Sequence, residues 1–178
     1  MRSSLIAAAL LASTLTVPAL CQTSSTMASG TAAVSDATFV RKAAISDMFE
    51  IQASQLAQSK AVSADVKSFA GRMVADHTKS SDQLKSVVST KPAMKPPTSL
   101  DAQHRALLSK LKAASGASFG TLYAKQQLQA HQQGVMLFTS ESQNGKDPDL
   151  KNFASQTLPT LQQHLSMAQG LQKGGGNP

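Results

Sequence analysis

Three histidines and one glutamate occupy positions in helical patterns where their side chains would point inward. His77, His131 and His164 fall on the apolar seams of three predicted helices, and Glu50 lies in line with small residues of a fourth. Imidazole and carboxylate groups suit Zn, Cu or Fe, and helical bundles build metal sites from ligands that project inward from facing helices. The pattern predicts a transition-metal site in a bundle core, with these four residues as ligands.

Three further residues are expected to contact these ligands without binding the metal themselves. Asp76 directly precedes His77, so its side chain leaves the helix about 100° away from that of His77 and is expected to pair with a histidine from outside. Tyr123 and Gln127 lie on the same helix face as His131, two turns and one turn before it. We expect them to add hydrogen bonds around the site.

The same residues have a second interpretation, as a buried polar layer without a metal. A core histidine can donate to a carboxylate or a backbone oxygen and so fix the register of a bundle. A ferritin-like oxidoreductase is disfavoured, because the di-iron pattern needs Glu-x-x-His pairs and the chain has none. No catalytic motif or small-molecule site stands out, so a binding or structural protein is expected rather than an enzyme.

The elements that must position these residues are four long helices and a short one, which predicts an all-α, four-helix bundle with one added helix. The apolar spacing and the start and stop residues predict long helices over residues 36–59, 64–91, 118–142 and 148–171. A capping box at residues 98–101 is expected to open the short helix, and Gly116 to end it. Pro159 should kink the last helix.

An internal repeat indicates how the helices pair. Residues 64–70 and 148–154 are similar, and each segment begins a long helix that follows another long helix. The chain is therefore expected to consist of two helix hairpins that bury their apolar faces against each other. When the two copies are aligned, Glu50 and His131 occupy equivalent positions, and His77 and His164 fall on corresponding seams.

The ends of the chain differ in composition from the predicted bundle domain at residues 36–172. Residues 1–21 have the layout of a secretory signal peptide, with a short basic start, an apolar run and small residues before the expected cleavage after Cys21. Residues 22–35 resemble a flexible linker, and residues 173–178 a disordered tail. The protein is therefore expected to be exported to the periplasm or the outer membrane.

The charge pattern narrows the expected partners. Lys and Arg outnumber Asp and Glu by 17 to 10, but the basic residues are scattered, and there is one Tyr and no Trp. Nucleic-acid binding is not expected, because it would need a basic stripe with aromatic partners. Weak association with an anionic envelope surface and formation of a homo-oligomer remain open. The main alternative to metal binding is thus a structural or stress-related interaction module of the cell envelope.

Other residues capable of chemistry are given ordinary roles at this point. His104, between polar neighbours on the short helix, is expected to be exposed, and Glu141 to lie on the surface at the end of its helix. Met48, Met73 and Met136 are expected to fill the core rather than to bind copper.

Several distinctive segments occur in order from about residue 39 to residue 171. They are Phe39-Val40, Ala43-Ala44, Met48-Phe49-Glu50, Val66-Lys67-Ser68-Phe69-Ala70, Met73-Val74-Ala75-Asp76-His77, Phe119 with Tyr123, His131, and Leu158-Pro159-Thr160-Leu161-Gln162-Gln163-His164-Leu165. On these segments the chain resembles a family of exported bacterial proteins with a domain of unknown function, often labelled putative outer membrane proteins. It departs from the family pattern at Gly120, where an acidic residue is expected. The resemblance implies a ferritin-like helical bundle and export, but no established activity.

Overall fold

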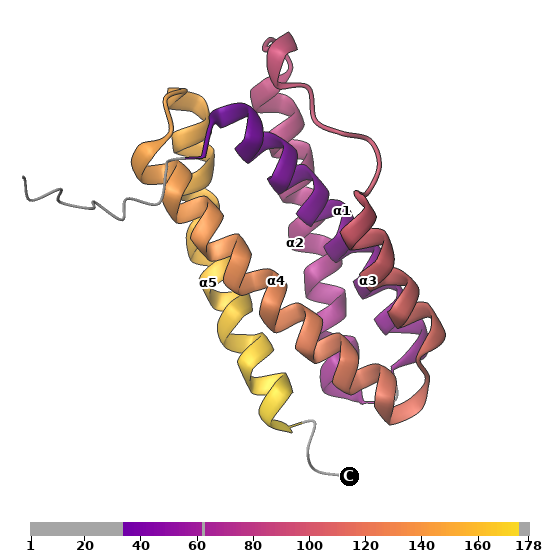
Figure 1. The fold of residues 1–178 in the computed structure, drawn as a ribbon. Coiled ribbons are helices and arrows are strands. Elements are labelled where there is room, and N and C mark those ends of the chain that lie inside the picture. Colours follow the sequence, from indigo (N-terminus) through magenta and orange to yellow (C-terminus); the bar gives the residue numbers. More distant parts are fainter. Residues whose placement is uncertain (1–33, 62, 175–178) are drawn as a thin grey trace, which may run out of the picture. The chain divides into compact units, whose positions relative to one another are not determined.

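The computed structural model describes residues 34–61 and 63–174, and every regular element among them is helical. The described residues form four long α-helices and a short one, whose arrangement Figure 1 shows. Their bounds are α1 Asp36–Lys60, α2 Ala64–Val88, the 3-10 turn η1 Pro92–Met94, α3 Ala102–Ala113, α4 Gly116–Asn144 and α5 Pro148–Gly174. The predicted signal segment, most of the predicted linker and the last four residues lie outside the described part of the chain.

Short polar side chains fix where the helices begin. The Ser35 hydroxyl accepts a hydrogen bond from the backbone N–H of Thr38 at the start of α1. Ser63 caps α2 in the same way. At the start of α5 the Asp147 carboxylate accepts from two backbone N–H groups, those of Asp149 and Leu150. These caps satisfy donors that the first helical turn leaves free, so the sequence sets these boundaries locally.

Two predicted boundaries are wrong. The N-cap of α3 is Asp101, whose carboxylate accepts from the His104 N–H, so the helix begins after the predicted capping box rather than within it. Gly116 does not end the short helix, which stops at Ala113, but begins α4. Its φ of 54° lies in the left-handed region that glycine adopts at little cost, so it forms the sharp turn between α3 and α4.

The four long helices form two hairpins, α1 with α2 and α4 with α5 (Figure 1). Contacts between α1 and α4 and between α2 and α5 join the hairpins into a four-helix bundle. The short α3 packs on the outside against α1 and α4. The predicted all-helical architecture of two hairpins and an added helix is confirmed, and α5 continues as one helix through Pro159.

The bundle core consists of two apolar clusters with a polar layer between them. One cluster contains Phe49, Phe69, Met73, Phe119 and Tyr123, and the other contains Phe39, Leu84, Phe138, Leu150 and Phe153. In α2, α4 and α5 a buried histidine separates the residues of one cluster from those of the other. The three histidines therefore lie at the middle of the bundle, with apolar side chains on both sides.

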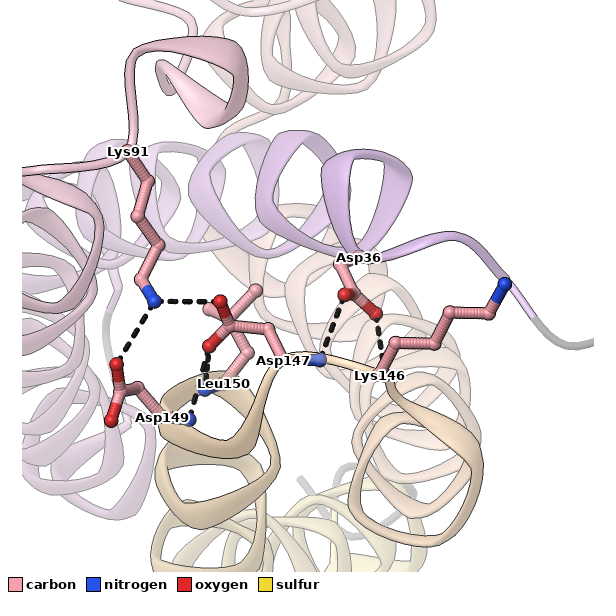
Figure 2. A network of polar contacts seen from close by, with 6 residues as sticks. All are labelled: Asp36, Lys91, Lys146, Asp147, Asp149 and Leu150. Atoms are coloured by element: carbon pink, nitrogen blue, oxygen red, sulfur yellow. Dashed lines mark hydrogen bonds and ion pairs between the residues drawn. The ribbon is translucent and has the colours of Figure 1, made fainter.

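A polar network fastens one end of the bundle (Figure 2). Asp36 accepts from the backbone N–H groups of Lys146 and Asp147, which ties α1 to the α4–α5 turn. Lys91, just beyond α2, forms ion pairs with Asp147 and Asp149 at 2.6 and 2.9 Å. The start of α1 and the segment after α2 are thus both linked to the start of α5, the first by hydrogen bonds and the second by ion pairs.

Within the described ranges, none of the helices combines the length and the apolar character that crossing a bilayer requires.

Candidate metal centre

His77 of α2, His131 of α4 and His164 of α5 meet in the polar layer. Their ring centroids lie 5.3 to 5.6 Å apart. One ring nitrogen of each histidine lies within 4.8 Å of one ring nitrogen of both others. The seam positions on three different helices therefore bring three imidazoles together, as the helical spacing predicts.

Each of these rings uses one nitrogen to contact an oxygen of the protein. Nδ1 of His77 lies 2.8 Å from Oδ1 of Asp47, on α1. Nδ1 of His131 lies 2.8 Å from the backbone oxygen of Gln127, one turn earlier in α4. Nε2 of His164 lies 2.8 Å from Oδ2 of Asp76, on α2. Because these oxygens accept, each contacting nitrogen carries a proton, and in the neutral form of the ring the other nitrogen keeps its lone pair.

The remaining nitrogen of each ring has no partner. Nε2 of His77, Nε2 of His131 and Nδ1 of His164 are all buried without a hydrogen bond. The three residues are only 1–3% exposed. Buried polar atoms are nearly always paired, so three unpaired nitrogens in one cluster of neighbouring rings are unusual. Such an arrangement fits a metal ion, because ligating histidines commonly direct their second N–H to a carboxylate or a carbonyl.

The distances are compatible with one ion after a small adjustment. At a metal–nitrogen distance of about 2.0–2.1 Å, tetrahedral ligands lie roughly 3.4 Å apart. Since no pair of the three nitrogens is more than 4.8 Å apart, each separation must shorten by less than about 1.5 Å.

The pKa values keep two of the rings neutral. Burial, together with the charge of the neighbouring His77, lowers the pKa of His131 to about 3. Burial also lowers the pKa of His164 to about 4, against the opposing effect of the Asp76 hydrogen bond. Burial acts on His77 in the same direction, but the hydrogen bond and the charge of Asp47 outweigh it, so its pKa is raised. The Asp47 contact therefore distinguishes His77 from the other two.

Asp47 is the residue that the sequence interpretation missed. Its side chain is 5% exposed and contacts His77 directly, so Glu50 is not the only acidic group that points inward. Asp47, Glu50 and Ser54 are spaced by three and four residues and are all buried, so they share one face of α1. That spacing was the available signal, because three polar residues then recur on an inward-facing stripe.

Glu50 lies beside the histidines but is not a member of the group whose ligand atoms lie within 4.8 Å of one another. It is 1% exposed, and neither carboxyl oxygen has a hydrogen-bond partner. Burial raises the pKa of Glu50 to about 7, although His77 and the Gln127 amide lower it. The structure thus places this predicted ligand next to the histidine group rather than within it.

The other predicted supporting residues have different partners. The Gln127 side chain is buried without a hydrogen bond of good geometry, and its backbone oxygen contacts His131. The Tyr123 hydroxyl lies 2.8 Å from the Ser54 hydroxyl, two turns along α4 from the histidine layer. The polar layer therefore continues as a stripe between α1 and α4.

Three secondary predictions are wrong. Glu141 is 2% exposed rather than on the surface, because its carboxyl group lies against Gly145 in the α4–α5 turn. Met136 is 64% exposed and so is not part of the core. The His104 side chain is only 22% exposed, since it packs against Phe49 and contacts Asp101. Of these contacts, that of His104 with Phe49 joins elements that are distant in the sequence.

A family model described as a domain of unknown function, DUF4142, matches residues 21–171, so the chain belongs to this family. Among solved structures the chain is similar to one titled "CopM in the Cu(II)-bound form", with a TM-score of 0.64 and 16% sequence identity. The match covers 79% of this chain and 97% of the CopM chain. At this identity the likeness establishes the fold alone. No curated protein sequence matches the chain.

Proposed function

We propose that this member of the DUF4142 family binds one transition-metal ion, with Cu(II) bound most strongly, through His77, His131 and His164. The observation that carries the proposal is a cluster of three buried histidine rings, each with one unpaired nitrogen, in which one nitrogen of each ring lies within 4.8 Å of one nitrogen of both others. Each opposite nitrogen is held by an oxygen, which fixes the ring orientation and the tautomer before any ion arrives.

A purely structural polar layer accounts less well for these contacts. A buried polar atom without a partner costs about 1–3 kcal/mol. The histidine layer contains three such nitrogens, in addition to both oxygens of Glu50. A layer that served only to fix the register of the bundle would be expected to pair these atoms with one another. An ion that accepts three lone pairs removes the cost at the nitrogens in one step.

The chemistry of the ligands favours Cu(II). Imidazole binds Cu(II), Zn, Ni and Fe, and among divalent ions Cu(II) binds most tightly to a given nitrogen site. Cu(I) prefers thiolate and thioether sulfur, and the ligand group contains no sulfur. The likeness of the fold to CopM, whose structure is titled as Cu(II)-bound, supports the same choice.

The burial of the site favours holding an ion over catalysis. Catalytic metal sites keep a coordination position open to substrate, whereas sites that only hold an ion are closed by protein. All three histidines are almost fully buried. The proposed role is therefore metal binding or buffering. With the signal peptide expected at residues 1–21, that role would be performed in the cell envelope.

The experiment is to measure the metal content of the mature protein, purified from cells without a chelator or an affinity tag, by mass spectrometry. His131→Ala and His164→Ala would remove one ligand each, and His104→Ala is the matched control, since His104 lies on α3 outside the group. We expect about one ion per chain in the wild type and in the control, and a loss in both ligand variants. Wild-type protein that remains free of metal after exposure to Cu(II), Zn and Fe(II) would refute the proposal and favour the structural layer.

A further inference from the structure

The three supports of the histidines differ in their access to solvent. The Asp47 side chain, which contacts His77, is 5% exposed. The backbone oxygen of Gln127 lies inside α4, and the Gln127 residue is 0% exposed. The Asp76 side chain, which contacts the buried ring of His164, is 32% exposed. Among the described residues that support the ligands, Asp76 thus connects a ligand to the surface.

Arg72 covers this connection. Its Nε donates to the same Asp76 oxygen that contacts His164, at 3.3 Å, and its Nη2 donates to Oε1 of Gln163 at 2.9 Å. Arg72 and Asp76 belong to α2, and Gln163 belongs to α5 and precedes His164. These contacts form a clasp, consisting of Arg72, Asp76 and Gln163, that joins α2 to α5 beside His164.

We propose that this clasp is the gate through which the metal ion enters and leaves, an inference that rests on the metal site proposed above. An ion must pass from water to nitrogens that are almost fully buried, and a carboxylate attracts cations along its path. Asp76 supplies a carboxylate that contacts both solvent and the ligand His164. The cationic Arg72 repels the ion while it covers Asp76, so it must turn away before the ion can pass.

The clasp is suited to this motion. The Arg72 side chain is 45% exposed, so turning it into water disturbs no core packing. Opening breaks its contacts with Asp76 and Gln163 and leaves the Asp47 and Gln127 supports intact. Arg72 therefore acts as a positioning residue: it holds Asp76 against His164 and slows exchange without touching the ion.

The test compares the rates at which loaded protein releases Cu(II) to an excess of a coloured chelator, followed by stopped-flow absorbance. Arg72→Gln removes the cation, and Gln163→Ala removes the second partner of Arg72 without changing the charge. Lys85→Gln is the matched control, since it removes one cation from an exposed Lys–Asp pair on the same helix. Capture of Cu(II) by the metal-free proteins would be measured in parallel.

We expect release from Arg72→Gln to be roughly five to thirty times faster than from the wild type, because hydrogen bonds worth about 1 kcal/mol each are lost. Capture should accelerate as well, so the affinity should change by less than about threefold, and Gln163→Ala should show a smaller acceleration.

Release from Arg72→Gln at the rate of Lys85→Gln would overturn the gate while leaving the metal site intact. Loss of the metal from folded Arg72→Gln would also overturn it, because Arg72 would then be needed to hold the ion. A wild type that binds no metal would refute site and gate together.

Discussion

The bundle gathers polar side chains at two places, the histidine layer in its centre and the network around the α4–α5 turn at one end. At the end, all four carboxyl oxygens of Asp36 and Asp147 accept hydrogen bonds (Figure 2). In the centre, each of three histidines has one paired nitrogen and one unpaired nitrogen. The first arrangement uses its polar atoms to join helices, and the second leaves three nitrogens unpaired, which is the basis of the proposed metal site.

One residue near the end network does not follow this division. Glu141 is buried with both oxygens unpaired, but among the described residues it belongs to no group of three or more metal-ligating side chains. Its neighbours Asp36 and Asp147 repel its charge, and burial is the main cause that raises the pKa of Glu141 to about 7. Buried polar atoms without a partner therefore indicate a metal site only when several ligand residues lie close together.

The largest effect is expected when a ligand is replaced by an apolar residue of similar size. His131→Leu should weaken Cu(II) binding by more than about 100-fold, the upper range for loss of a mere supporting contact. The stability of the metal-free protein should be unchanged or increased, because a buried unpaired nitrogen is removed. Calorimetric titration and urea unfolding would measure the two quantities. A clear loss of metal-free stability with unaltered affinity would show that the layer is structural.

A smaller loss of affinity is expected when the support behind a ligand is weakened. Asp47→Asn keeps an oxygen that can accept from His77 but removes the negative charge. Supporting contacts of this kind change metal affinity by about 10- to 100-fold. Competition with a chelator of known affinity would measure the change. An affinity equal to that of the wild type would mean that the Asp47 charge plays no part in binding.

A substitution in the end network should lower the stability of the protein and leave its affinity for the metal unchanged. Asp36→Ala leaves the N–H groups of Lys146 and Asp147 without their charged acceptor, which should lower the free energy of unfolding by about 2 kcal/mol. The affinity for Cu(II) should stay the same, since the network does not touch the histidines. If this variant lost the metal as well, the two places would be coupled and the division between them would fail.

The smallest effect is expected at Glu141 and depends on pH. A carboxyl group whose pKa is raised in the folded state, here from 4.5 to about 7, favours the folded state at low pH and loses this contribution as the pH rises through 7. Glu141→Gln removes the group, so the variant should exceed the wild type in stability by about 1–2 kcal/mol at pH 8 and match it near pH 4.5. Urea unfolding at the two pH values would test this. A constant difference would mean that Glu141 is charged throughout.

Much of the fold could be predicted from the sequence because its determinants are local. Ser63 and Asp147 begin their helices through contacts within one turn, and the repeated segments at the starts of α2 and α5 indicate the two hairpins. The seam spacing also places His77, His131 and His164 on inward faces, so their meeting follows once the hairpins pair.

The remaining features depend on contacts between helices. Asp47 lies on α1, which packs against α2, α3 and α4, so its pattern of apolar residues does not identify one inward face. The clasp depends on how α2 and α5 are aligned along their lengths. A count of residues along the sequence does not give this alignment, because Pro159 lies in α5 close to the clasp.

The most direct test of the metal site is a crystal structure of the protein loaded with Cu(II), with anomalous diffraction measured at the copper edge. The account predicts one strong peak about 2.0–2.1 Å from Nε2 of His77, Nε2 of His131 and Nδ1 of His164, a distance typical of metal–imidazole bonds. Asp47, Asp76 and the Gln127 carbonyl should keep their contacts with the opposite nitrogens. A peak only at an exposed residue such as His104, or no peak in the bundle centre, would contradict it.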